Sequence, residues 1–284
     1  MILNLDPNFK PVSGKEIAFE HFIFSGGEPH IKIMPDFNKS VPVYVTHRLN
    51  AFKDLGLLSL ACDALVRMGA TLDTLVIPYF PAARQDRVMV EGEPLSVKVY
   101  ADIINSLPFQ KVVIFDSHSE VTPALVEGCV AIPNHKFVQK VIDSIGNDLI
   151  LISPDGGALK KIYKLSEYLG GIEVVECSKS RDVKTGKLSG FQVYSEDLSG
   201  KDCLIVDDIC DGGGTFLGLA QELLKKNAGH LYLAVSHGIF SKGLDALGEG
   251  FQHIYTTDSF RKMEHGKLTQ IALSNDILSL EINR

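Results

Sequence analysis

The sequence predicts an α/β protein of two similar domains, each a mostly parallel β-sheet flanked by helices. Apolar runs rich in β-branched residues alternate with longer amphipathic stretches, which is the pattern of buried strands alternating with helices. Strands that alternate with helices form parallel sheets with right-handed crossovers. The order of strand, polar strand end, turn and helix occurs in both halves, and 284 residues are enough for two domains.

Seven apolar runs have the length and composition of buried strands. They cover residues 42–48, 74–80, 111–117, 148–154, 171–177, 201–208 and 230–236. The two clearest helical patterns are residues 51–70, with Gly69 near the end, and residues 216–229, where two lysines precede Gly229 as a stop.

The boundary between the domains must be compact, because no low-complexity linker separates the two halves. The loop around Pro133 and Asn134, which precedes a helical pattern, is the best candidate for this boundary. We therefore expect one domain over residues 1–134 and a second over residues 135–284. The tail 267–284 is a candidate for packing back onto the first domain.

Composition and charge argue against several classes of protein. Hydrophobic residues make up 45% of the chain and charged residues 22%, as in an ordinary globular protein. The net charge of −7 argues against binding to nucleic acid or a membrane surface, which needs basic patches. No run approaches 18 apolar residues and the N-terminus lacks a secretion signal, so we expect a cytoplasmic protein. The five cysteines form no CxxC pair, which argues against disulfides and a zinc site.

Residues 207–216, DDICDGGGTF, have the composition of a site for phosphate and sugar hydroxyls. Glycines let the backbone approach a ligand and turn N–H groups toward it, and a helix that opens at Thr215 favours an anion. Asp207 and Asp208 end an apolar strand and can accept hydrogen bonds from ribose hydroxyls or hold a divalent metal. The alternative is a plain strand–turn–helix connection. The two acids before the glycines argue against this alternative.

Two other strands end on polar segments. DSHSE, residues 116–120, closes a strand in the first half, and SPDGG, residues 153–157, closes a strand in the second. In open α/β sheets, ligand sites gather beyond the carboxyl ends of the strands. We therefore expect functional side chains in these two segments and in residues 207–216.

Several motifs together resemble one enzyme family. Residues 204–215, LIVDDICDGGGT, resemble the fingerprint shared by type I phosphoribosyltransferases and ribose-phosphate pyrophosphokinases, the PRPP synthetases. Residues 76–87, VIPYFPAARQDR, are similar to a segment found only in the second group, and residues 24–28, FSGGE, to its FSDGE segment. DSHSE, SPDGG and SHGIFS, residues 236–241, follow in the family's order. The sequence is therefore identified as a member of the PRPP synthetase family, which implies a phosphoribosyltransferase-like fold in both domains.

The resemblance implies transfer of the β,γ-diphosphate of Mg-ATP to the 1-hydroxyl of ribose 5-phosphate, which gives PRPP and AMP. Such chemistry needs positioning and charge neutralisation more than covalent help. It also implies Mg2+ as cofactor and a homodimer or higher homo-oligomer with a shared ATP site. The expected ribose-phosphate-binding residues are Asp207, Asp208, Asp211, Gly212, Gly213, Gly214 and Thr215.

By the same resemblance, the first domain binds ATP. Arg84 and Gln85 would hold the nucleotide, because a planar guanidinium suits phosphate oxygens. Asp86 is expected to brace this loop. Phe24 and Glu28 match residues that contact adenine from a neighbouring subunit. Taken without the motifs, Arg84 would be a surface arginine and Phe24 a core residue.

His118 and Asp155 match the family's ligands of the ATP magnesium, with Asp116 placed to orient the imidazole. Asp155 could equally cap the helix that follows it. Lys179 and Arg181 match two cations of the family's mobile catalytic loop, which would close on the transferred diphosphoryl group. The alternative for this stretch is a solvated charge run on a hairpin.

Two positions depart from the family pattern. The aspartate of FSDGE is Gly26 here, which removes an expected hydrogen bond near adenine. The threonine usual in the phosphate loop is Gly212, which removes a hydroxyl donor to a terminal 5-phosphate and opens space. A wider loop motivates a second acceptor, ADP-ribose, whose product would be ADP-ribose 1-diphosphate in NAD metabolism. Against this, loop glycines also serve backbone geometry.

Two other classes of function fit parts of the sequence. A non-catalytic partner that regulates a true synthetase would not need the intact Lys179 and Arg181. A base-condensing phosphoribosyltransferase would explain the phosphate loop but not the ARQDR segment. Cys177 and Cys210 flank the predicted site, either as redox-sensitive thiols or as small passive side chains.

Overall fold

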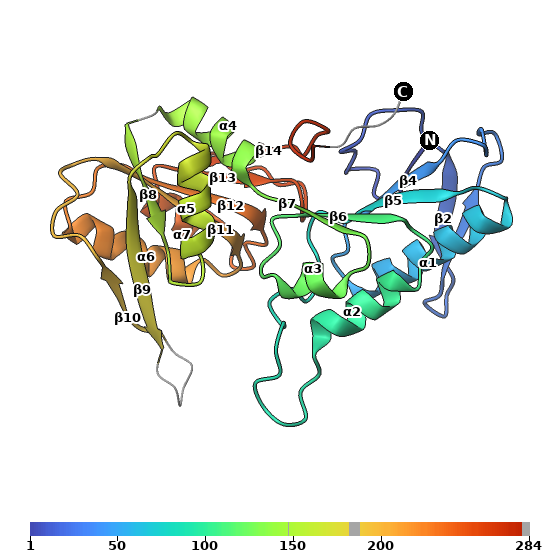
Figure 1. Cartoon of the computed structure of the whole chain (residues 1–284), viewed down its shortest axis with the longest axis horizontal. Coiled ribbons are helices and arrows are strands. Elements are labelled where there is room, and N and C mark those ends of the chain that lie inside the picture. The colour runs from blue at the N-terminus through green and yellow to red at the C-terminus, as the bar shows by residue number, and fades with distance from the viewer. Residues whose placement is uncertain (147, 182–187, 280–284) are drawn as a thin grey trace. The chain divides into compact units, whose positions relative to one another are not determined.

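The computed structural model describes residues 1–146, 148–181 and 188–279, apart from the side chains of residues 180, 181, 188 and 189. The chain divides into two compact units, whose elements are labelled in Figure 1. The first unit comprises Met1–Pro133 and Ala272–Arg284, and the second comprises Asn134–Ile271.

This division can be compared with the one expected from the sequence. The first unit ends at Pro133, one residue before the expected boundary. The expected tail is divided, because residues 268–271 pair as the last strand of the second unit's sheet. The residues that follow belong to the first unit, and among them Leu273, Ile277 and Leu278 are buried.

The first unit is built on a five-stranded parallel sheet with the strand order β1-β4-β5-β6-β7. Its strands are β1 (Ile2–Asn4), β4 (Val43–Thr46), β5 (Leu72–Val76), β6 (Lys111–Phe115) and β7 (Cys129–Ile132). An antiparallel hairpin outside this sheet consists of β2 (Phe19–Ile23) and β3 (Pro29–Ile33). The helices are α1 (Phe52–Arg67), α2 (Ser96–Asn105) and α3 (Val121–Leu125).

The spacing of apolar residues explains why α1 is helical and which face it buries. Leu55, Leu58, Ala61, Cys62 and Leu65 recur every one to three residues along one side of the helix, and all are buried. They form one hydrophobic core with residues of β4, β5 and β6. This core fixes the sheet whose strand ends carry the ARQDR and DSHSE motifs.

The second unit contains a seven-stranded sheet with the order β10-β9-β8-β11-β12-β13-β14, parallel except between β9 and β10. Its strands are β8 (Leu149–Ser153), β9 (Val174–Arg181), β10 (Leu188–Val193), β11 (Asp202–Cys210), β12 (Leu231–Gly238), β13 (His253–Thr257) and β14 (Leu268–Ile271). Its helices are α4 (His135–Ile145), α5 (Leu159–Tyr168), α6 (Gly214–Lys225) and α7 (Asp245–Gly250).

Helices cover both faces of this second sheet. Buried residues of α6 and α7 share one core cluster with alternate residues of β8 and β11, such as Ile150 and Ile152. Buried residues of α4 and α5, such as Phe137 and Ile162, lie outside that cluster. In Figure 1, α5 lies on the near side of the strands.

The predicted α/β class with parallel sheets is confirmed, and all seven predicted strands and both predicted helices are present. Helix α6 begins at Gly214, earlier than expected, because it starts directly from the phosphate loop. Outside these seven runs, β1, β7, β10 and β14 lie at sheet edges, β2 and β3 form the separate hairpin, and β13 is an internal strand. Among the described residues, none of the helices combines the length and hydropathy that a membrane span requires.

Candidate active site

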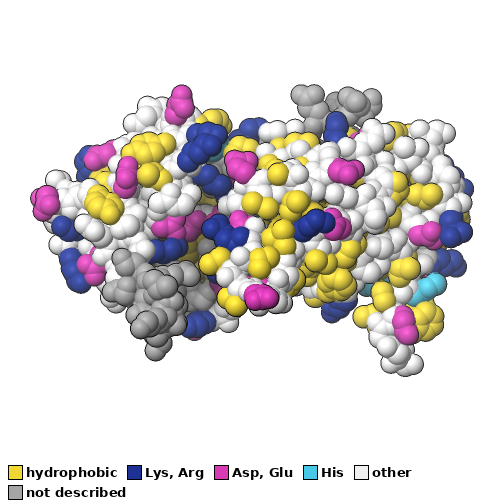
Figure 2. Space-filling model, turned by 60° about the horizontal axis from the view of Figure 1, so that its bottom comes forward, with side chains coloured by type: hydrophobic (Ala, Val, Ile, Leu, Met, Phe, Trp, Pro, Cys, Tyr) yellow, Lys and Arg dark blue, Asp and Glu magenta, His cyan; other side chains and the backbone are white. Residues whose placement is uncertain are grey.

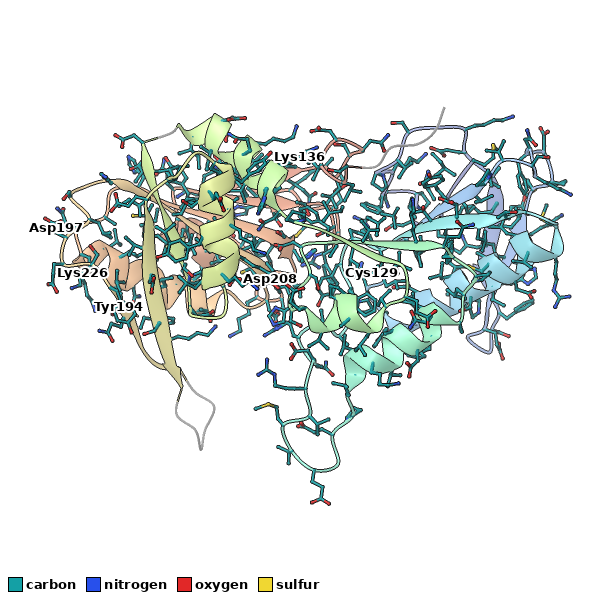
Figure 3. The ribbon with its side chains drawn as sticks, viewed as in Figure 1. Cys129, Lys136, Tyr194, Asp197, Asp208 and Lys226 are labelled. Carbon is teal, nitrogen blue, oxygen red and sulfur yellow. The ribbon has the colours of Figure 1, made fainter. Side chains whose placement is uncertain are left out.

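Three neighbouring strands of the second unit bring predicted side chains to one edge of the sheet. β8 pairs with β9 on one side and with β11 on the other. Asp155 follows β8, Lys179 lies on β9, and Asp207 and Asp208 lie near the carboxyl end of β11. Figure 3 marks Asp208 at this edge.

Asp207 and Asp208 form a close pair of acidic residues. Asp208 is buried, and its backbone N–H donates to Oδ1 of Asp207 at 2.8 Å. Burial raises the pKa of Asp207 well above its ordinary value, and the carboxyl groups of Asp208 and Asp155 raise it further. Such a carboxyl pair favours ligands that donate hydrogen bonds or carry positive charge.

Lys179 and Asp155 form an ion pair between the ammonium and Oδ2. The other oxygen, Oδ1, accepts the backbone N–H groups of Gly157 at 2.8 Å and Ala158 at 3.1 Å. Burial acts to raise the pKa of Asp155, but Lys179 and the two N–H donors outweigh burial and hold the pKa below its ordinary value. Asp155 therefore caps the turn ahead of α5 and holds a cation at the same time.

The predicted phosphate loop, residues 211–215, runs from the end of β11 into the start of α6. Gly213 has a φ of +76°, and a Cβ there would lie 3.0 Å from three side-chain atoms of Leu247. Glycine adopts this left-handed conformation without a steric penalty. Neither Gly212 nor Gly214 has a positive φ, and a Cβ would make ordinary contacts at the first and meet open space at the second. The backbone thus requires only the middle glycine.

Residues 236–241, SHGIFS, hold the phosphate loop from the neighbouring strand β12. Ser241 donates its hydroxyl to Oδ1 of Asp211 at 2.6 Å and its backbone N–H to the Asp211 carbonyl at 3.0 Å. Phe240 has a φ of +45°, which is uncommon for a residue other than glycine. The sequence placed this segment in the family's order without a role, because its partner Asp211 is distant along the chain.

In the first unit, the loops that follow β5 and β6 are linked by Asp86. The Asp86 side chain is 6% exposed and accepts a hydrogen bond from Arg87 at 3.1 Å. Burial acts to raise the pKa of Asp86, but hydrogen bonds from Arg87 and Ser119 and the charges of Arg87 and His118 lower it below its ordinary value. Asp86 therefore joins the ARQDR loop to the DSHSE turn.

The predicted ATP-binding side chains Arg84, Gln85 and His118 are exposed on these two loops. Each loop also contains a residue with a left-handed backbone, Ala82 with a φ of +56° and Asp116 with a φ of +41°. Strained backbone of this kind is concentrated at ligand-binding loops. The left-handed residues are therefore a second feature, besides the sequence motifs, that favours a binding site on these two loops.

Phe24 and Glu28 lie in the turn of the β2–β3 hairpin, where the Phe24 N–H donates to the Glu28 carbonyl at 2.9 Å. Phe24 is 52% exposed, and its ring meets that of Phe22 edge-on with centroids 4.7 Å apart. The alternative that Phe24 is a core residue is therefore wrong. A Cβ on Gly26 would lie 3.1 Å from Cδ of Glu28, so the glycine leaves room for that carboxylate. Hydrophobic side chains with a histidine beside them protrude at the lower right of Figure 2.

Arg181 ends β9, and both its side chain and residues 182–187 of the predicted catalytic loop lie outside what the structure describes. Cys177 and Cys210 are free and buried, and burial raises the pKa of each thiol to about 12. The thiolate is the reactive form of cysteine, and these thiols stay protonated at neutral pH. Burial and the raised pKa therefore favour the other alternative, in which these cysteines are small passive side chains.

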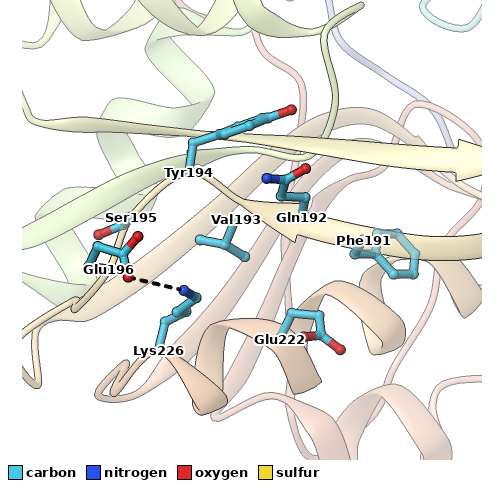
Figure 4. Close-up of a pocket in the computed structure, with 8 residues that line it drawn as sticks. All are labelled: Phe191, Gln192, Val193, Tyr194, Ser195, Glu196, Glu222 and Lys226. Carbon is cyan, nitrogen blue, oxygen red and sulfur yellow. Dashed lines mark ion pairs between the residues drawn. The ribbon is translucent and has the colours of Figure 1, made fainter.

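A cavity of about 480 Å3 lies between β10 and the end of α6 (Figure 4), lined by none of the predicted site residues. Across the β9–β10 ladder, Phe191 stands opposite Lys179. At the other end, Lys226 and Glu196 form an ion pair at 4.0 Å. No sequence motif indicates this cavity. Its lining residues are Phe191, Gln192, Val193, Tyr194, Ser195, Glu196, Glu222 and Lys226.

Two family models match the chain. One, the N-terminal domain of ribose phosphate pyrophosphokinase, matches residues 17–107, and the other, the phosphoribosyl transferase domain, matches residues 131–246. A ribose-phosphate pyrophosphokinase of Mycoplasma genitalium is 32% identical over 238 residues, which cover 81% of this chain and 69% of that protein. The chain belongs to the ribose-phosphate pyrophosphokinase family. The resemblance recognised in the sequence is confirmed, and the base-condensing phosphoribosyltransferase loses support because the first model covers the FSGGE and ARQDR motifs.

Other members of the ribose-phosphate pyrophosphokinase family match nearly the full chain. The ribose-phosphate pyrophosphokinase of Thermococcus kodakarensis is 29% identical over 280 residues, which cover 98% of this chain and 97% of that protein. The crystal structure of phosphoribosylpyrophosphate synthetase from Mycobacterium smegmatis has a TM-score of 0.80 at 23% identity and covers 93% of this chain and 89% of its own. That structural likeness confirms the fold.

Proposed function

We propose that this protein transfers the β,γ-diphosphate of Mg-ATP to the 1-hydroxyl of ribose 5-phosphate, giving PRPP and AMP. The observation that carries the proposal is the arrangement at the edge of the second sheet. There the Lys179–Asp155 ion pair stands beside a pair of acids and a phosphate loop that begins on the same strand. This combination joins a sugar-phosphate site to a cation suited to phosphoryl chemistry.

The ribose half of the site follows from charge and backbone geometry. Asp207 and Asp208 accept hydrogen bonds from the ring hydroxyls, which relieves the repulsion that raises the pKa of Asp207. The backbone N–H groups of residues 212–215 receive the 5-phosphate at the start of α6, where the helix dipole favours an anion. Asp211, held by Ser241, fixes the loop.

The ATP half is contributed by the first unit. Arg84 and Gln85 bind the nucleotide from the loop that Asp86 anchors. The exposed ring of Phe24 and the nearby Glu28 would contact adenine in a second copy of the chain, so the active form is a homodimer or a larger oligomer. An exposed aromatic ring on a hairpin is suited to stacking on a base.

Mg2+ is the cofactor that this reaction needs, to neutralise the phosphates of ATP. Among the described residues, no group of three histidine, cysteine or acidic side chains is arranged as a complete metal site. That is compatible with an ion that arrives with ATP and keeps several water ligands. Asp155 fits the role, because its Oδ2 already faces a cation, and the exposed His118 is the second proposed ligand.

Lys179 has two positions in the proposed cycle. In the free protein its charge is held by Asp155. If Asp155 held the magnesium of bound ATP, Lys179 would be free to approach the transferred diphosphoryl group, where negative charge develops. Arg181, two residues along β9, would supply a second cation. The chain thus keeps a reactive cation neutralised until the nucleotide is bound.

The test offers Mg-ATP with ribose 5-phosphate, ADP-ribose or no acceptor, and measures AMP by chromatography. We expect AMP and PRPP with ribose 5-phosphate and only a background of AMP without acceptor. AMP formed with ADP-ribose alone would replace the acceptor and leave the reaction class intact. No acceptor-dependent AMP under any condition would refute the proposal and favour a non-catalytic partner.

A further inference from the structure

The glycine at position 212 is not explained by the backbone of the phosphate loop. Gly212 has no positive φ, and a Cβ there would lie no closer than 3.4 Å to any other atom outside its chain neighbours. The backbone at this position would therefore tolerate an added Cβ. Gly213 alone has the conformation that requires glycine. The missing side chain at position 212 must have another reason.

The space beside Gly212 is bordered by Lys242. A Cβ on Gly212 would lie 3.4 Å from Cδ and Cε of Lys242 and 3.7 Å from its Cγ, so the aliphatic stem of the lysine runs along the loop. A threonine at position 212 would add two more heavy atoms against this stem. The two residues are therefore complementary: the glycine makes room for the lysine.

The position of Lys242 is fixed by its neighbours. Ser241 is tied to Asp211 by two hydrogen bonds. Gly243 has a φ of +79°, and its N–H donates to the carbonyl of Phe240 at 3.0 Å, which closes a tight turn around Lys242. The lysine therefore does not hang from a free loop, and it is placed where the phosphate loop is held.

The ammonium of Lys242 is available for a ligand. The side chain is exposed, and in the described part of the chain it makes no hydrogen bond or ion pair. The adjacent acids have partners of their own, Asp211 with Ser241 and Asp245 with His265 at 3.5 Å. An unpaired cation thus borders a loop whose N–H groups and helix dipole also favour an anion.

We propose that Lys242 binds the phosphate on O5 of the ribose substrate and replaces the threonine hydroxyl that Gly212 lacks. This inference rests on the proposed function, since it assigns one contact of the same ribose-phosphate site. A lysine is a point charge on a flexible stem and needs no fixed donor geometry. Lys242 therefore suits a phosphate whether it is a terminal monoester, as in ribose 5-phosphate, or is esterified further, as in ADP-ribose.

The test compares Lys242→Met, which keeps the stem and removes the charge, with Lys164→Met. Lys164 is an exposed lysine of α5 and the matched control. We expect Lys242→Met to raise the KM for ribose 5-phosphate about tenfold, the usual scale for a lost charge-assisted hydrogen bond. The KM for ATP and kcat should stay within about twofold, and Lys242→Arg should retain most of the affinity. A KM equal to that of Lys164→Met would overturn the proposal.

Calorimetric titration separates this inference from the proposed reaction, because it needs no turnover. Ribose 5-phosphate, ADP-ribose and unphosphorylated ribose are each titrated into the wild type and Lys242→Met. We expect the variant to lose affinity for each phosphorylated ligand that the wild type binds. Ribose should bind both proteins equally. Equal affinities of the two proteins for such a phosphorylated ligand, or no binding of either ligand to the wild type, would overturn the role of Lys242. Lysine-dependent binding without any AMP formation would instead overturn the proposed reaction.

Discussion

Replacing Gly213 by alanine should destabilise the protein more than the same change at either neighbouring glycine. A non-glycine residue in the left-handed conformation costs roughly 1–2 kcal/mol. The new Cβ would also lie 3.0 Å from three side-chain atoms of Leu247, which is 2% exposed and belongs to the hydrophobic core. Overpacking of this kind typically costs about 1–3 kcal/mol. We therefore expect Gly213→Ala to lower the free energy of unfolding by roughly 2–5 kcal/mol.

The measurement is thermal unfolding followed by circular dichroism in the absence of ligands. A loss of this size corresponds to a Tm lower by about 3–10 °C for a chain of this length. Gly212→Ala and Gly214→Ala are the matched controls, because neither position has a positive φ and neither Cβ would be crowded. Each should stay within about 1 kcal/mol of the wild type. Equal Tm values for all three variants would refute the reasoning.

Three further predictions concern the site and its supporting strands. Burial and neighbouring acids raise the pKa of Asp207, so wild-type stability should fall as pH rises from about 4, where unfolded carboxyls ionise, through the folded pKa. Asp207→Asn has no carboxyl to ionise here, so the Tm of the variant minus that of the wild type should be larger at pH 7 than at pH 4. The same variant should bind ribose 5-phosphate more weakly. A Tm difference at pH 7 that is equal to or smaller than the difference at pH 4 would contradict this prediction. Lys179→Ala should lower kcat about 100-fold to 1000-fold with little effect on the KM for ATP. The control Lys226→Ala, beside the separate cavity, should leave kcat unchanged. Equal kcat values for the two variants would show that Lys179 takes no part in the reaction. Gly218→Ala would bring a Cβ against the ring of Phe191 and separate β10 from α6, which should lower Tm; an unchanged Tm would mean that this contact adds nothing to stability.

The loops of the candidate site were predictable only where a motif marks them. ARQDR, DSHSE and DDICDGGGT have compositions that stand out along the chain, so Arg84, His118 and Asp207 could be named from the sequence. Ser241 ends the SHGIFS motif, to which the sequence assigned no role, and Lys242 lies outside every motif. Their roles followed from contacts with Asp211 and Gly212, which the pairing of β11 with β12 brings close.

The sequence by itself determined the α/β class, seven of the strands, the two longest helices and the family. These depend on the period of apolar residues and on local motifs, both of which are properties of consecutive residues. Tertiary structure decided which strand ends meet. The order β9-β8-β11 places Lys179 against Asp155 and Asp155 close enough to Asp207 to raise its pKa, and no periodicity along the chain encodes that order. It also decided that Gly213 serves the backbone and Gly212 does not, because the difference lies in one dihedral angle and in the side chain that packs beside each glycine.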